Sequence, residues 1–104
     1  MKLFVLALSF LTTLPVFAAA VNDQQRECIA NDLATQIRVE NGTNFKVIDQ
    51  FEESNQVLDL SVEITFPDGI GSRGIVTIKN SDYANAVFTI SGINPQPINI
   101  KNCF

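Results

Sequence analysis

One stretch of the sequence constrains the fold more than any other, the segment QVLDLSVEITF at residues 56–66. Apolar and polar residues alternate strictly along it, and the apolar positions are Leu58, Leu60, Val62, Ile64 and Phe66. Successive side chains of an extended strand point to opposite faces, so the alternation predicts a strand with one face on a core and the other in water. Strands of this kind are typical of antiparallel sheets. The stretch constrains the fold and leaves the function open.

The first segment of the chain, MKLFVLALSFLTTLPVFAAA, has the three-part layout of a secretory signal peptide. Lys2 precedes an apolar run, and Ala18–Ala20 supply the small residues of a cleavage site. The run is short for a membrane span, although a retained anchor is the alternative. We therefore expect a signal peptide at 1–20, a single small domain at 21–104, and export to the periplasm or the outside. No membrane span is expected after signal removal.

Charge and cysteine content narrow the expected partners and environment. Loss of Lys2 with the signal leaves six basic residues against eleven acidic ones, a net charge of −5. An acidic domain without a basic cluster is expected to repel nucleic acid. The two cysteines, Cys28 and Cys103, lie near the ends of the expected domain, and an even cysteine count in an exported chain predicts a disulfide. Free reactive thiols and an intermolecular bond are the alternatives.

Residues 21–40 have the pattern of a helix. Asn22 is the expected N-cap, and Gln25 stands where a capping box requires it. Asn41–Gly42 is expected to end the helix, because both residues tolerate the left-handed conformation. Apolar residues recur every four positions along one stripe, which suits a helix lying across a sheet: Ile29, Leu33 and Ile37.

Strand patterns follow the helix at residues 44–53, 56–66, 75–80, 84–91 and 98–103. Phe45, Val47 and Phe51 are expected on the inner face of the first strand. The links between strands are short enough for hairpins, which predicts an antiparallel sheet. The expected fold class is therefore α+β, with one N-terminal helix packed on a curled antiparallel sheet of four to five strands and closed by one disulfide.

One helix covers only one sheet face. The expected residues of the other face are Val57, Asp59, Ser61, Glu63, Thr65, Thr77, Val87, Thr89 and Lys101. The order of elements resembles the cystatin-like architecture. The inhibitory hairpin of cystatins has a Gln-x-Val-x-Gly pattern, and the stretch Gln56–Leu60 does not match it. The resemblance thus implies a fold and no inhibitory activity.

The residue types in the chain give little support for a catalytic function. A serine or cysteine nucleophile usually needs a nearby base, most often histidine, and the chain has none. Asp59 and Glu63 share the outer strand face and would suit calcium or acid–base work. We favour the other interpretation, in which these two carboxylates belong to a solvated acidic surface that keeps the domain soluble. We therefore expect no enzyme, no cofactor and no metal site.

The glycine-rich segment 68–74 is the most site-like part of the sequence, and it is expected to form a long hairpin connection. The candidate binding residues of this segment are Ile70, Ser72 and Arg73. Glycines allow backbone N–H groups to point outward, and the guanidinium of Arg73 adds a cation, so the segment could bind an anionic group or a protein partner. The favoured function is a small exported binding or inhibitor-type protein that acts on a protein partner. The alternatives are a small carboxylate-dependent hydrolase or toxin-like enzyme, and a self-associating structural subunit of the cell envelope.

Overall fold

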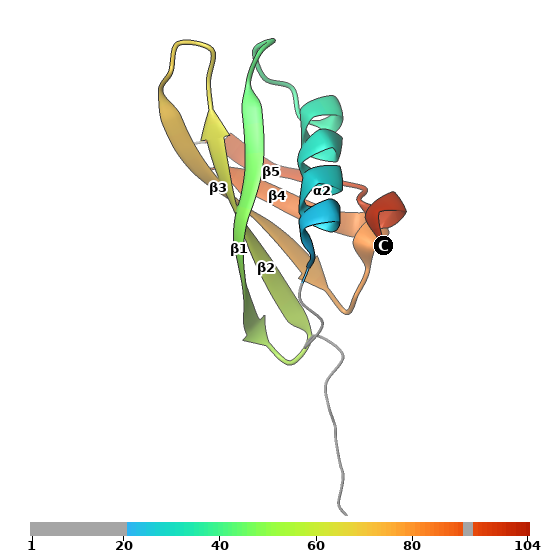
Figure 1. Cartoon of the computed structure of the whole chain (residues 1–104). Helices are drawn as coiled ribbons and strands as arrows, with labels where there is room; N and C mark the ends of the chain where they lie inside the picture. The colour runs from blue at the N-terminus through green and yellow to red at the C-terminus, as the bar shows by residue number, and fades with distance from the viewer. Residues whose placement is uncertain (1–20, 91–92) are drawn as a thin grey trace, which may run out of the picture.

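The computed structural model describes residues 21–90 and 93–104, so the signal peptide expected at 1–20 lies outside the described residues. One α-helix precedes a five-stranded sheet with the strand order β1-β2-β3-β4-β5, antiparallel throughout (Figure 1). The elements are α2 (Asp23–Gln36), β1 (Asn44–Ser54), β2 (Val57–Thr65), β3 (Gly71–Lys79), β4 (Ala86–Ile90) and β5 (Ile93–Ile98), with short 3-10 helices at Tyr83–Asn85 and Lys101–Cys103. The α+β fold class is confirmed.

Helix α2 begins as expected and ends early. Asn22 caps it, and the reciprocal hydrogen bonds with Gln25 complete a capping box. The prediction that Asn41–Gly42 ends the helix is wrong, because α2 stops at Gln36 and Ile37 is already extended. Ile37 is buried from this extended position. Gly42, with φ of 92°, instead turns the chain into β1.

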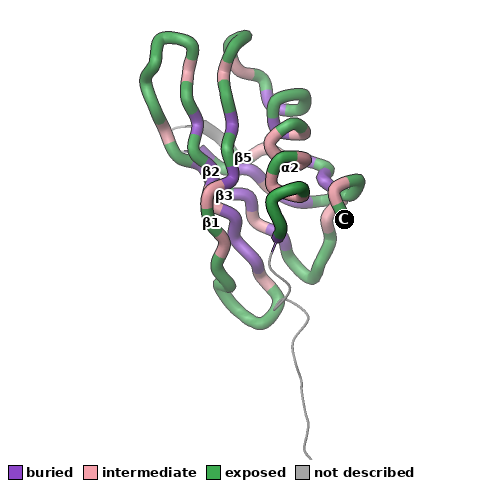
Figure 2. Tube along the Cα trace, in the orientation of Figure 1, coloured by how far each residue is buried: buried purple, intermediate pink, exposed green. Residues whose placement is uncertain are grey.

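The core fills the space between α2 and the inner face of the sheet (Figure 2). The inner face predicted for β2 is confirmed, since its positions are all buried: Leu58, Leu60, Val62 and Ile64. The outer face is only partly in water, because Asp59 is also buried. Phe88 of β4 meets Phe45 edge-on, with ring centroids 6.0 Å apart. A Cβ on Gly74 of β3 would lie 2.8 Å from two ring carbons of Phe88, so the absent side chain makes room for that ring.

A register shift in β1 corrects the expected position of Phe51. The pairing with β2 skips one residue between Val47 and Asp49, which is the mark of a β-bulge. Because the side-chain period of a strand is two, one inserted residue moves every later side chain to the opposite face. Phe45 and Val47 are buried as predicted, but Phe51 is 47% exposed and lies opposite Asp59 on the outer face.

Two strand boundaries also differ from the predictions. Strand β3 begins at Gly71, so the long connection expected through Gly74 is only a tight turn. The last strand is β5 at Ile93–Ile98 and carries Pro95 and Pro97, where the sequence suggested a loop. Prolines are tolerated there because β5 pairs only with β4 and has a free edge.

The C-terminal segment returns to the helix after β5. Cys103 lies in a 3-10 helix and is bonded to Cys28, with their Cα atoms 5.6 Å apart, so the predicted disulfide is confirmed. Lys101 belongs to this 3-10 helix, and its expected place on the outer sheet face is wrong. The backbone of Asn99 exchanges two hydrogen bonds with the amide of Gln36, both 2.8 Å long. The segment is thus held to α2 covalently and by polar contacts.

Candidate binding surface

The turn between β2 and β3 is closed by its own hydrogen bonds. The N–H of Phe66 donates to the carbonyl of Ile70 at 2.9 Å, and the N–H of Gly69 donates to the carbonyl of Phe66 at 2.8 Å. The carboxylate of Asp68 accepts from the N–H of Ile70 at 2.9 Å. This turn holds Ile70 at the tip of the hairpin, 63% exposed.

The three binding residues expected in this region do not converge. Ser72 and Arg73 are consecutive residues of β3, so their side chains point to opposite faces. Ser72 is opposite the buried Ile64, and Arg73 is opposite the exposed Glu63. The structure thus places Ile70 at the tip, Ser72 on the inner face and Arg73 on the outer face.

A second candidate surface lies on the outer face of the sheet, opposite the face on which α2 packs. Phe51 is 47% exposed and Ile75 is 39% exposed on this face. Half-buried or buried side chains of β2, β3 and β4 lie on the same face near these two residues. We call the following residues the outer-face patch: Phe51, Val57, Asp59, Ile75, Thr77 and Val87. Sequence reasoning missed Phe51 here, because a strict period of two places it in the core.

The prediction that Asp59 belongs to a solvated acidic face is wrong. Asp59 is only 6% exposed, and its Oδ1 accepts a hydrogen bond of 2.9 Å from the hydroxyl of Thr77. Glu63 stays exposed, opposite Lys46 and Arg73. Asp59 and Glu63 are four positions apart in one strand, a span of about 13 Å between their Cα atoms. The paired carboxyl groups of glycoside hydrolases stand about 5–9.5 Å apart, so this arrangement gives that kind of hydrolase no support.

A groove of about 550 Å³ runs between α2 and β1. Arg26 reaches across it, donating to the carbonyls of Val21 at 3.3 Å and Ile48 at 3.4 Å. Asp23, Glu27 and Lys46 add charges of both signs. The guanidinium of Arg26 is therefore already bonded to backbone carbonyls in this groove. The mixed charges of the lining residues favour neither an anionic nor a cationic ligand.

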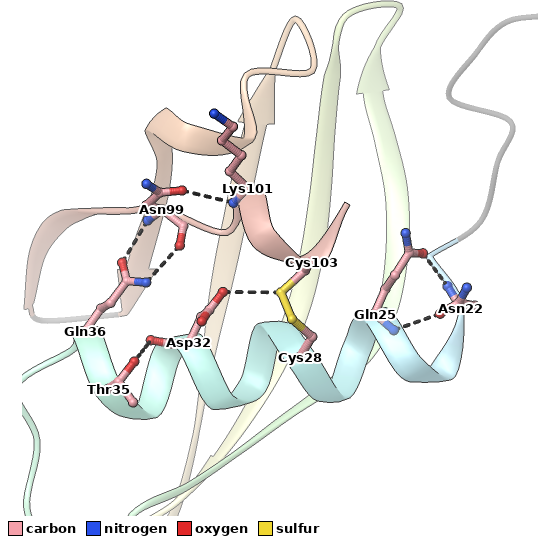
Figure 3. Close-up of a disulfide and its surroundings, with 9 residues drawn as sticks. All are labelled: Asn22, Gln25, Cys28, Asp32, Thr35, Gln36, Asn99, Lys101 and Cys103. Atoms are coloured by element: carbon pink, nitrogen blue, oxygen red, sulfur yellow. Dashed lines mark hydrogen bonds between the residues drawn. A yellow bond between two sulfur atoms is a disulfide. The ribbon is translucent and has the colours of Figure 1, made fainter.

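The carboxyl of Asp32 lies against the disulfide (Figure 3). Its Oδ2 is 3.2 Å from Sγ of Cys103, and the three groups Cys28, Asp32 and Cys103 fall within 4.8 Å of one another. Both sulfurs are consumed in the bond, so the cluster offers a metal one carboxylate and no thiolate. Burial raises the pKa of the Asp32 carboxyl above its ordinary value.

The raised pKa predicts a pH-dependent effect of Asp32→Asn. The folded protein holds the Asp32 proton to a higher pH than the unfolded chain does, so its ionisation lowers stability as pH rises above the ordinary value of 3.8. The substitution should raise the free energy of unfolding slightly at pH 7, by a few tenths of a kcal/mol at most because solvent screens this partly exposed carboxyl, and leave it unchanged near pH 3. Urea unfolding at the two pH values measures the difference.

Asp23→Asn is the matched control. Asp23 lies in the first turn of the helix, where the dipole favours a negative charge. Its loss should slightly lower stability at pH 7, opposite in sign to the effect at Asp32. Stabilisation by Asp32→Asn that persists unchanged at pH 3 would contradict the electrostatic explanation.

Comparison of the chain with family models, with curated proteins and with solved structures found no match. In the part of the chain that the structure describes, no helix has the length and apolar character needed to cross a membrane. The functional argument therefore depends on the chain's own surfaces. Among the side chains that the structure describes, large apolar ones are exposed in the outer-face patch, at the hairpin tip at Ile70 and at Phe104, whose ring stacks on Tyr83.

Proposed function

We propose that the protein is an exported binding module that holds a protein partner against the outer-face patch. The observation that carries the proposal is the exposure of Phe51 and Ile75 on the sheet face opposite α2. Large apolar side chains gathered on one surface are typical of association sites, and aromatic residues contribute most to such contacts. The strands beneath the patch are hydrogen-bonded in one sheet, so a partner would meet a preformed surface.

The residue types support binding over catalysis. The chain has no histidine, and both cysteines are bonded. Asp59 is engaged with Thr77 and is far along the strand from Glu63. Export is supported by the signal-like segment 1–20, and the disulfide is compatible with an oxidising compartment.

The decisive experiment is capture of a partner from the native periplasmic or extracellular fraction with the oxidised protein as bait. Phe51→Ser combined with Ile75→Thr should reduce capture at least about tenfold, because both side chains lose apolar contact area. Both positions are exposed, so the fold should survive. Circular dichroism and an unchanged unfolding midpoint check that it does.

The hairpin tip supplies the control variant, Ile70→Asp. Ile70 is exposed and lies in the turn, outside the patch, so capture should be unchanged. Arg73 is left unaltered in this control, because it lies on the outer face two residues from Ile75. If the tip variant loses the partner and the patch variant keeps it, the outer-face proposal is wrong and the contact is at Ile70.

Sedimentation of the protein alone tests the self-associating alternative. A monomer at high concentration agrees with a foreign partner. A dimer that the patch variant converts to monomer would mean that a second copy of the chain covers this face.

A further inference from the structure

Asp59 is an unusual residue for the uncovered face of a sheet. It is 6% exposed, although α2 packs on the other side. Burying a carboxylate among apolar groups is costly unless partners compensate it. The residues directly opposite it in register are Phe51 of β1 and Thr77 of β3, and neither carries a positive charge. The carboxylate is thus buried in the outer-face patch with no cation directly opposite it, and Lys79 stands opposite Val57, one pair further along the same face.

Only one oxygen of this carboxylate has a protein donor among the described residues. Oδ1 accepts from Thr77. In the described part of the chain, every side-chain oxygen or nitrogen that is fully buried has a hydrogen-bond partner. Oδ2 makes no such bond, so it is not completely buried and keeps some contact with solvent. The patch therefore holds one carboxylate oxygen without a protein donor, beside the apolar side chains of Phe51 and Val57.

The residues beside Asp59 on the outer face define the chemistry of its ligand. Phe51 stands on one side and is 47% exposed, and Ile75 is 39% exposed on the same face as Thr77. Apolar surroundings strengthen an ionic contact relative to water. An aromatic face also attracts a cation, and arginine combines a long aliphatic stem with a planar guanidinium that stacks on such rings. The net charge of −4 for the chain favours a basic partner as well.

We infer that Asp59 is the anionic recognition point of the outer-face patch and that it receives an arginine side chain of the partner. The guanidinium donates to Oδ2 and lies against the ring of Phe51, while the aliphatic stem packs on Ile75. Thr77 holds the carboxylate in place through Oδ1. This inference rests on the proposed function and adds the chemical class of the partner's contact residue.

Amide NMR titration of the disulfide-bonded protein with N-acetyl-arginine-N-methylamide tests the inference. The amide signals of Phe51, Asp59 and Ile75 should shift with the arginine probe. The citrulline analogue has the same shape without the charge, and it should bind at least about tenfold more weakly. Raising the salt concentration from about 10 mM to about 300 mM should weaken arginine binding, because ions screen a partly exposed pair.

Asp59→Asn is the matched variant, because its amide oxygen still accepts from Thr77 while the charge is gone. It should lower arginine affinity to the citrulline level. Equal shifts with both probes, no shift with arginine, or no salt dependence would overturn the inference. The salt test uses the unaltered protein and does not depend on how the variant folds.

The two proposals fail in different ways. If the arginine probe does not bind but Phe51→Ser with Ile75→Thr still abolishes partner capture, the binding surface stands and the arginine contact is wrong. If that double variant leaves capture unchanged, the proposed surface itself is wrong.

Discussion

Replacing Cys28 and Cys103 with alanine should lower the free energy of unfolding by about 4 kcal/mol, the largest loss among the variants proposed for this chain. The bond joins residues 75 positions apart in the sequence. It therefore restricts nearly the whole unfolded domain, and the entropy of closing so long a loop is what the variant regains on unfolding. Small domains have total stabilities of about 5–15 kcal/mol, so the variant should be marginal at 37 °C.

Denaturant unfolding of the double alanine variant beside the oxidised protein measures this loss. The unaltered protein, unfolded in the presence of a reducing agent, is the control and should show the same decrease. The bonds between Gln36 and Asn99 and the buried Ile100 keep the C-terminal segment near α2 without the disulfide, so a folded baseline should remain. A loss under about 1 kcal/mol would contradict the loop-closure argument.

Gly74→Ala should lower the free energy of unfolding by about 1–3 kcal/mol, the range for overpacked cores. The new Cβ would stand 2.8 Å from two ring carbons of Phe88 and 3.1 Å from the carbonyl oxygen of Thr89. Phe88 is 1% exposed and packs against Phe45, so its ring has little room to move. The cost is steric, and Tm or urea midpoints measure it.

Gly71→Ala in the same strand is the control, because its Cβ would meet only the carbonyl oxygen of Ile64, at 3.7 Å. Its effect should be close to zero. Phe88→Leu combined with Gly74→Ala should cost less than the sum of the two single changes, because the smaller side chain leaves space for the methyl group. Additive effects would mean that Phe88 is not the source of the clash.

The strictly alternating segment was the most predictable part of the fold. Leu58, Leu60 and Val62 are buried as their spacing requires, because β2 is paired on both sides and has no bulge that changes its register with β3. The capping box at Asn22 was predictable for a similar reason, since its hydrogen bonds join residues three apart in the sequence. Both features could be predicted because they depend on residues that are close together in the sequence.

The outer-face patch could not be predicted because it depends on a register shift. Val47 and Ile48 are adjacent apolar residues, and this break in the alternation was the one sequence signal for the bulge. If the bulge is ignored, the alternation assigns Phe51 to the core and leaves the outer face without its aromatic residue. The burial of Asp59 follows from the same shift, since Phe51 then stands beside it.

The predicted ends of the helix and of the last strand were wrong where tertiary contacts outweighed local conformational preference. The turn residues Asn41–Gly42 suggested a helix stop, but Ile37 is extended and buried, so the helix ends before it. Pro95 and Pro97 suggested a loop, but the pairing of β5 with β4 leaves one edge free, where prolines do no harm. Neither outcome can be read from neighbouring residues alone.

The position of the disulfide also determines how the domain responds to mechanical force. A pull applied to residues outside the Cys28–Cys103 pair passes from the first turns of α2 directly through the sulfur–sulfur bond. The five strands lie between the two cysteines in the sequence, so they carry none of the tension. In the oxidised state the sheet, with the outer-face patch on it, should keep its shape under a load on the chain ends. After reduction the same load would act across the sheet.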